Sequence, residues 1–229
     1  MLRRRLVLAL LAAGATIALF AGPAFAAVSI VQPGQTYAGK NYQQWSIAWW
    51  QWAAGIGKDN NPVTDPTGAS CGTHQRGPVW FLTAPAGDPT SPSCTVPADK
   101  AVLVPVFNVE WSTHEINPFV DPPRNATESE LPGIVEFFAD GVTTLTASVD
   151  GQSVDVAPFR TNLTAEYPLT WAAGNAFGAD PGRSVSVADG WYLLIRPLSV
   201  GVHTIDVHSE IPGIFTITTH YTLHVTDQT

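Results

Sequence analysis

Large aromatic side chains recur at helical spacing between residues 41 and 56, and this segment constrains the fold more than any other. Successive members of the stripe lie 3, 4, 3 and 4 residues apart, which places them on one face of a helix: Tyr42, Trp45, Trp49, Trp52 and Ile56. Asn41 and Gln44 can cap its start, and Gly55 can end it. The stripe predicts a helix that buries one face against a sheet. Trp50 lies off the stripe and is expected to be exposed.

Short strands separated by Gly- and Pro-rich turns make up most of the remaining chain. Strands are expected at 79–83, 101–109, 143–149 and 191–195. Pro105 interrupts the second of these, which indicates either an edge strand or a bulge.

Turn and cap signals organise the C-terminal half. Asp150-Gly151 predicts a tight hairpin that pairs Ala147 with Val154 and Leu145 with Val156. A further hairpin is expected from 202–209 and 214–225. Thr127 and Glu130 form a capping box that predicts a second helix, 128–140. The fold class that follows is mainly β, a β-sandwich with an N-terminal Trp-rich helix and a second short helix.

The N-terminus has the three parts of a signal peptide. Arg3, Arg4 and Arg5 precede an uncharged apolar run, 6–20, and Ala24-Phe25-Ala26 is a small-x-small cleavage site. We therefore expect residues 1–26 to be removed and 27–229 to form a single domain. The alternative is a membrane anchor, for which the run is short. The protein is expected to be secreted and either extracellular, periplasmic or associated with the cell wall. The scarcity of lysine suits a bacterial source with a GC-rich genome.

Charge excludes some partners. Without the three signal arginines, 8 basic side chains face 19 acidic ones, a formal charge of −11. This balance disfavours nucleic acid, because its binding depends on neutralisation of phosphates by Lys and Arg. No later stretch is long and apolar enough to span a membrane.

The chain has two cysteines, Cys71 and Cys94. In an exported protein they most simply form one disulfide. The closed loop would contribute about 3 kcal/mol in the chain-entropy model. Two free catalytic thiols are the alternative.

Two segments have a distinctive sequence. They are Trp45-x3-Trp49-Trp50-x-Trp52 and Gly77-Pro78-Val79-Trp80-Phe81-Leu82, with Cys71 between them and Cys94 beyond. Together they resemble a family of secreted bacterial proteins of uncharacterised function. The resemblance covers most of the mature chain and implies a shared fold and a Cys71–Cys94 pair. It implies no catalytic residues and no cofactor.

Two groups of residues could bind or cleave a carbohydrate. Glu110 and Glu115 could serve as acid and base in glycoside hydrolysis, although an acidic solvated loop is the ordinary interpretation. Trp50, Trp111 and Trp171 fit no core pattern, and exposed rings could stack on sugars. Their ordinary role would be to anchor loops.

Two groups could bind metal. The last hairpin places Asp206, His208 and His220 on one polar face, with His224 farther along the strand. Oxygen ligands also gather in the loop after the Trp helix: Asp59, Asn60, Asn61 and Asp65. A solvent-facing sheet and turn-capping residues are the ordinary interpretations, and no metal or cofactor is expected.

No nucleophile elbow or phosphate loop is present in the sequence. The leading hypothesis is a non-catalytic extracellular binding or surface protein, with polysaccharide or the cell wall as partner. A carboxylate-dependent hydrolase and a metal-binding protein are the alternatives.

Overall fold

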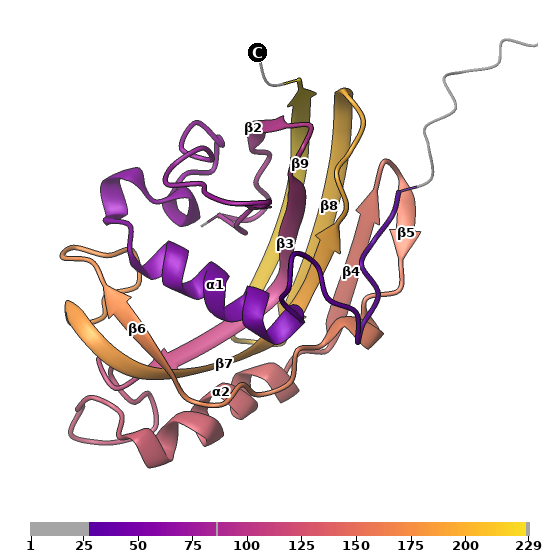
Figure 1. Ribbon diagram of the computed structural model, residues 1–229. Helices are drawn as coiled ribbons and strands as arrows, with labels where there is room; N and C mark the ends of the chain where they lie inside the picture. The colour runs from indigo at the N-terminus through magenta and orange to yellow at the C-terminus, as the bar shows by residue number, and fades with distance from the viewer. Residues whose placement is uncertain (1–27, 86, 228–229) are drawn as a thin grey trace, which may run out of the picture.

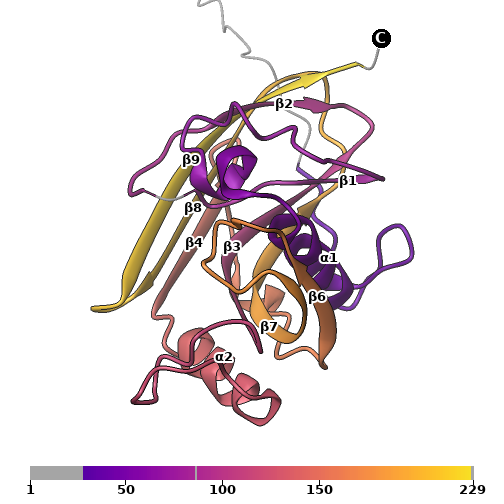
Figure 2. The same ribbon diagram turned by 90° about the vertical axis from the view of Figure 1, so that its left-hand side faces the viewer.

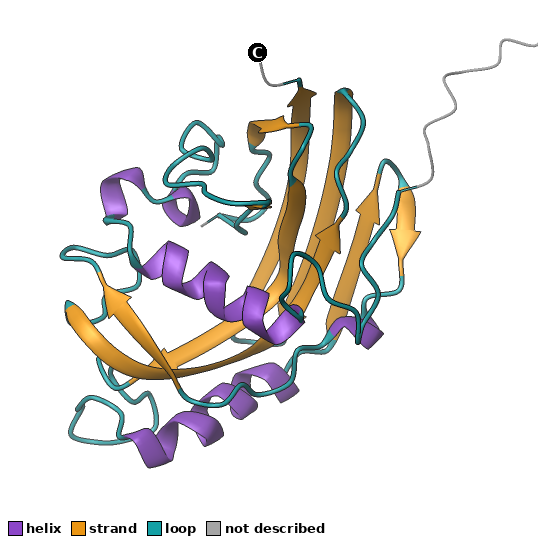
Figure 3. Cartoon of the chain, in the orientation of Figure 1, coloured by secondary structure: helices purple, strands orange, loops and turns teal. Residues whose placement is uncertain are grey.

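Two β-sheets and two α-helices make up the computed structural model, which describes residues 28–85 and 87–227 (Figure 3). The expected signal peptide, 1–26, lies outside the described residues. The first sheet has the strand order β1-β3-β7-β6 and the second β2-β9-β8-β4-β5. The strands are β1 (Val79–Phe81), β2 (Ser93–Pro97), β3 (Ala101–Ser112), β4 (Thr144–Val149), β5 (Gln152–Val154), β6 (Tyr167–Trp171), β7 (Gly182–Ile195), β8 (Gly201–Ile211) and β9 (Phe215–Thr226). The expected β-sandwich-like fold class is confirmed.

The two α-helices lie on opposite faces of the first sheet (Figures 1 and 2). Helix α1 (Tyr42–Ala54) packs against β6 and β7, and α2 (Leu131–Asp140) packs against β3 and β7. Alternate residues of β7 serve the two helices: the hydroxyl of Tyr192 contacts Ser46 on α1, whereas Val187 packs beneath α2. The long strand β7 therefore has helices on both of its faces.

Helix α1 forms where the aromatic spacing predicted it. The Asn41 side chain accepts the backbone N–H of Gln44 at 2.9 Å, and the Gln44 side chain accepts that of Asn41 at 3.0 Å. This reciprocal cap satisfies two of the free N–H groups at the helix start. The helix ends at Gly55.

The indole N–H groups of α1 bind the backbone of three loops. Trp45 donates to the carbonyl oxygen of Tyr37 at 3.1 Å, Trp49 to that of Leu82 at 2.6 Å, and Trp52 to that of Thr73 at 3.0 Å. The bonds from Trp49 and Trp52 satisfy loop carbonyls that lie outside the strand pairing, whereas the carbonyl of Tyr37 also accepts the backbone N–H of Lys40. The stripe of Trp side chains thus both fills the core and fixes these loops.

The capping box at Thr127 and Glu130 is present, as predicted. The segment opens with the 3₁₀ turn η3 (Glu128–Glu130), and α2 begins only at Leu131. Arg124 forms a bidentate pair with Glu130, at 2.9 and 2.6 Å.

The predicted hairpins are present with one difference. Ala147 pairs with Val154, and Asp150 and Gly151 both have positive φ, as a type I′ turn requires. Leu145 does not pair with Val156, because β5 ends at Val154 and the chain enters the 3₁₀ turn η4 (Ala157–Phe159). The β8–β9 hairpin is continuous from Gly201 to Val225.

Pro105 lies at a bulge rather than on an edge. Strand β3 is hydrogen-bonded to β1 on one side and β7 on the other. Its pairing with β7 shifts register between Pro105 and Phe107. The irregularity accommodates the missing N–H of the proline.

The disulfide Cys71–Cys94 is present and joins the loop after α1 to the edge strand β2. That loop contains two 3₁₀ turns, η1 (Lys58–Asn60) and η2 (Pro62–Thr64). Gly68 passes so close to β2 that an added Cβ would lie 2.3 Å from the carbonyl oxygen of Ser93, and its φ is +85°. Only glycine fits this crossing.

We predict that Trp49→Phe lowers the free energy of unfolding by about 2 kcal/mol more than Trp80→Phe does. Both substitutions replace a Trp side chain with Phe and so remove the same atoms. The first leaves the buried carbonyl of Leu82 without its donor, whereas the indole N–H of Trp80 is buried without a partner. Urea unfolding of the two variants measures the difference. Equal losses would contradict the role assigned to the indole hydrogen bond.

Candidate functional site

Two of the three Trp side chains expected to contact a ligand are buried. Trp50 is 6% exposed and Trp171 is 2% exposed, so the expectation that their rings face solvent is wrong. Both pack on Phe177, at 5.6 and 5.4 Å between ring centroids. Trp171 lies in β6, and its indole N–H donates to Ser112 Oγ at 3.0 Å. Trp50 is buried because α1 is covered on two sides, by the first sheet and by the loop that follows the helix. The spacing of aromatic residues in the sequence marks one buried face of the helix, so it predicts only one of these two packing surfaces.

Trp111 is half-buried beneath α2. Its ring stacks on Phe138 with centroids 5.7 Å apart and planes 10° apart, so one ring face is already covered. Beside it, Phe119 and Phe137 are 53% and 51% exposed and touch each other edge to face. Trp111 therefore belongs to an aromatic cluster around α2 and does not form a free platform with the other two Trp residues.

The structure brings Glu110 and Glu115 together. Glu110 lies near the end of β3 and is 4% exposed, and Glu115 follows in the turn after the strand. The backbone N–H and the hydroxyl of Ser112 both donate to Glu115 Oε2 at 2.8 Å. The hydroxyl of Ser186 donates to Glu110 Oε1. The two carboxyl groups also hydrogen-bond to each other.

Burial raises the pKa of Glu110 well above its usual range, and the neighbouring charge of Glu115 raises it further. Burial also raises the pKa of Glu115 to about 7, against the opposing effect of the hydrogen bonds from Ser112. The pair therefore holds a proton near neutral pH, and that proton supplies a partner for Glu110 Oε2, which has no other donor.

This arrangement does not suit glycoside hydrolysis. Retaining and inverting enzymes hold their carboxyl groups about 5 Å and about 6.5–9.5 Å apart, so that a sugar bond or a water fits between them. Carboxyl groups that hydrogen-bond to each other are closer than either value. Neither Glu110 nor Glu115 lines any of the surface hollows described below.

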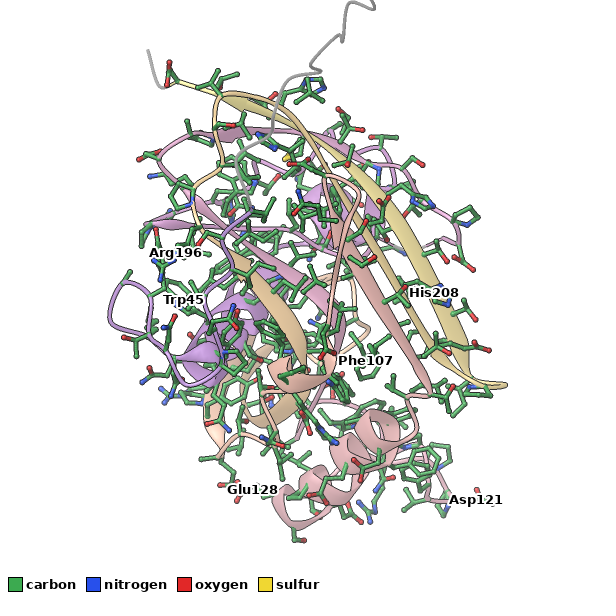
Figure 4. The ribbon with its side chains drawn as sticks, turned by 90° about the vertical axis from the view of Figure 1, so that its right-hand side faces the viewer. Trp45, Phe107, Asp121, Glu128, Arg196 and His208 are labelled. Atoms are coloured by element: carbon green, nitrogen blue, oxygen red, sulfur yellow. A yellow bond between two sulfur atoms is a disulfide. The ribbon has the colours of Figure 1, made fainter. Side chains whose placement is uncertain are left out.

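The polar face of the last hairpin is present in the expected register. Asp206 lies opposite His220 and His208 opposite Thr218, and Figure 4 places His208 on the outer side of this sheet. His220 Nδ1 lies 2.7 Å from an Asp206 carboxyl oxygen, and His208 Nδ1 lies 3.0 Å from the Thr218 hydroxyl. Within residues 28–85 and 87–227, no three His, Cys, Asp or Glu side chains are grouped to hold a metal ion.

The oxygen-rich loop after α1 uses its side chains as caps. Asp65 accepts hydrogen bonds from the backbone of Thr67 and Ser70, at 2.9 and 2.6 Å. The Asn61 amide donates to the carbonyls of Ala53 and Ile56 at the helix end. These are the turn and cap roles of the ordinary interpretation. Asp59 and Asn60 belong to η1 and are exposed.

Sequence reasoning missed a histidine that connects two turns. His203 Nδ1 lies 2.7 Å from Asp150 Oδ2, in the β4–β5 turn. Its Nε2 lies 2.9 Å from the carbonyl oxygen of Ser199 and 3.4 Å from the Ser199 hydroxyl. The order Ser-His-Asp is that of a hydrolase triad, but the carbonyl is the nearer partner of Nε2. We interpret His203 as a link between the hairpin turn and the β7–β8 loop. Asp150 gave only a turn signal in the sequence.

A groove runs along the part of α1 that stays exposed. Two hollows, of about 320 and 340 Å³, flank the exposed side chain of Gln51. We call them together the Gln51 groove. The first is lined by Gln51, Trp52, Gly55, His74, Arg76 and Phe81, and the second by Gln51, Pro168, Thr170 and Arg183.

Hydrogen bonds hold the floor of the Gln51 groove. Gln51 donates to the carbonyl of Pro168 on the edge strand β6 at 3.1 Å, and Trp52 holds Thr73. His74 follows directly and has a φ of +53°, which is uncommon for a residue other than glycine. Strained backbone of this kind clusters at functional sites. No sequence signal marked the groove, because its walls come from four separate segments.

Another hollow, of about 390 Å³, lies between the N-terminal segment and the β4–β5 hairpin. Asp155 is the one charged residue that lines it, and it shares Pro158 and Phe159 with a neighbouring hollow of about 290 Å³. Arg160 in that neighbour is already paired with Asp189 at 2.8 Å. The Gln51 groove offers more uncommitted polar groups, and we take it as the candidate site.

We predict that the protein loses stability as pH rises through about 7. The folded state raises the pKa of both glutamates above the ordinary value of 4.5, so it binds more protons than the unfolded chain, and its advantage is complete only below about pH 4.5. Glu110→Gln keeps a neutral group there at every pH. At about pH 8 this variant should exceed the wild type by on the order of 2 kcal/mol.

Denaturant unfolding at a series of pH values tests this, with Glu166→Gln, an exposed position, as the control. Parallel pH profiles for the wild type and Glu110→Gln would contradict the shared proton.

Within the described part of the chain, no helix is both long and apolar enough to cross a membrane. No protein-family model matches this sequence, and no curated protein or solved structure matches it either.

Proposed function

We propose that this protein is an exported, non-catalytic binding protein for carbohydrate and that the Gln51 groove is its binding surface. The observation that carries the proposal is the partly exposed side chain of Trp52 beside Gln51, His74 and Arg76 in a surface hollow. Aromatic rings pack against the apolar CH faces of sugars, and side-chain amides and hydroxyls bind their OH groups. Gln51 and Thr170 supply such groups on either side.

The groove is built from rigid parts. Trp52 is fixed by its bond to Thr73 and by ring contacts with Trp49 and Phe81, at 5.9 and 5.5 Å. A ligand therefore meets a ring that has already lost its rotamer freedom, which lowers the entropic cost of binding.

Export is part of the proposal. The disulfide Cys71–Cys94 suits an oxidising compartment, and residues 1–26 have the pattern of a signal peptide. The protein would then reach its ligand outside the cytoplasm, in the periplasm or at the cell wall. The hydrolase alternative is less favoured, because its two carboxyl groups are in contact and do not line the groove.

We expect the purified protein to be retained by at least one insoluble polysaccharide or cell-wall fraction without releasing sugar. The assay measures protein in the pellet and sugar in the supernatant. Trp52→Ala should weaken retention at least tenfold, because it removes the ring that stacks on the ligand. Gln51→Ala, at an exposed position, should weaken it less and leave the fold intact.

Phe137→Ala is the matched control, since it removes an exposed ring outside the groove. Circular dichroism checks that each variant is folded. Retention by no polysaccharide, or equal retention of Trp52→Ala and the wild type, would refute the proposal. Release of sugar would instead favour the hydrolase and make Glu110 and Glu115 the first positions to change.

A further inference from the structure

The arginines of the described chain fall into two groups. Three of the five have a partner: Arg124 pairs with Glu130, Arg160 with Asp140 and Asp189, and Arg196 lies 5.9 Å over the ring of Tyr37. Over residues 28–85 and 87–227, Arg76 and Arg183 have no carboxylate within salt-bridge distance, no side-chain hydrogen bond and no ring beneath them.

Both unpartnered arginines line the Gln51 groove, one in each hollow. Arg76 lies in the hollow with Trp52, and Arg183 lies in the hollow with Thr170, on the far side of Gln51. His74 adds a third basic side chain beside Arg76. No Asp or Glu lines either hollow.

The groove therefore carries positive charge although the chain as a whole is acidic. The mature sequence has 19 acidic and 8 basic side chains, yet the groove contains two arginines and no acid. A guanidinium group without a carboxylate partner keeps its forked pair of N–H donors free for a ligand. Local positive charge of this kind attracts anionic groups even when the net charge of the protein is negative.

We infer that the Gln51 groove binds an acidic polysaccharide, a polymer of uronic acid units. Arg76 and Arg183 each bind one sugar carboxylate, and the Trp52 ring packs against a sugar face beside Arg76. This inference rests on the proposed function and specifies its ligand class.

A uronate unit fits the groove better than a nucleotide does, because its carboxylate, its hydroxyl groups and its CH face all belong to one sugar ring. Such a ring presents hydroxyl and CH surfaces directly beside each carboxylate. Those surfaces match Gln51, Trp52 and Thr170, which lie between or beside the two arginines.

The test compares polygalacturonate with its fully methyl-esterified form, which has the same backbone without the charge. Binding of the whole mature protein is measured by calorimetry at low and high salt. We expect the acid form to bind at least tenfold more tightly than the ester, and its affinity to fall as salt rises. Dextran sulfate and dextran form a second pair that distinguishes sulfate groups from carboxylates as the anion.

Arg76→Ala and Arg183→Ala should each weaken binding to polygalacturonate about fivefold and leave binding to the ester unchanged. Arg196→Ala removes one exposed arginine outside the groove and should have no effect. All three positions are exposed, so the variants are expected to fold, and thermal unfolding verifies this.

Equal affinity for polygalacturonate and its ester would overturn the inference and leave carbohydrate binding intact. Loss of affinity in Arg196→Ala equal to that in the groove variants would also overturn it, because the effect would then reflect net charge. Tighter binding to dextran sulfate than to polygalacturonate would replace the uronate with a sulfated ligand. If the protein binds none of these polymers but is retained by a neutral polysaccharide, the inferred ligand class is wrong and the proposed carbohydrate binding stands. No binding to any polysaccharide would overturn the proposed function as well.

Discussion

Three indole N–H groups on one face of α1 hold the loops that the rest of the structure depends on. Trp45, Trp49 and Trp52 donate to the backbone carbonyls of residues 37, 82 and 73. Tyr42 acts in the same way at the helix start: its hydroxyl donates to Val31 and accepts from Leu194, which ties the N-terminal segment to β7. One helix thereby joins segments that are distant in sequence. Of these bonds, the one from Trp52 to Thr73 holds a wall of the Gln51 groove, beside His74.

Several polar side chains are buried on the face of the first sheet that α1 covers. The carboxyl pair of Glu110 and Glu115 belongs to this group, and so do polar atoms of Trp50 and Tyr167 that are buried without a partner. Buried acids cost stability unless they stay protonated or find donors. Here one shared proton and the hydroxyls of two serines offset that cost. The cluster therefore controls how stability depends on pH, whereas the groove faces solvent.

Local patterns were sufficient to predict much of the fold. The 3-4-3-4 spacing located α1, Asp150-Gly151 located the β4–β5 turn, and the two cysteines left one possible pairing. Local patterns do not predict burial correctly where two elements cover the same helix. Helical periodicity shows one buried face and so predicts that Trp50 lies in solvent, yet Trp50 packs on Phe177 in the loop between β6 and β7.

The candidate site was harder to predict, because it forms from the ends of several elements. Trp52 was assigned to the buried stripe, and nothing in the sequence places Arg76 and Arg183 on either side of Gln51. Glu110 and Glu115 were chosen by residue type, and only the turn after β3 shows that they touch. Contacts of this kind depend on tertiary packing and leave no periodic signal.

Hydrogen exchange of the indole protons, followed by NMR, tests the central role of α1 most directly. If the three hydrogen bonds hold the loops, the indole protons of Trp45, Trp49 and Trp52 exchange only when the whole domain unfolds, at the rate of the slowest amides in β7 and β8. Exchange of these protons while the sheet amides remain protected would show that the loops open independently. The account of a preformed groove would then be wrong.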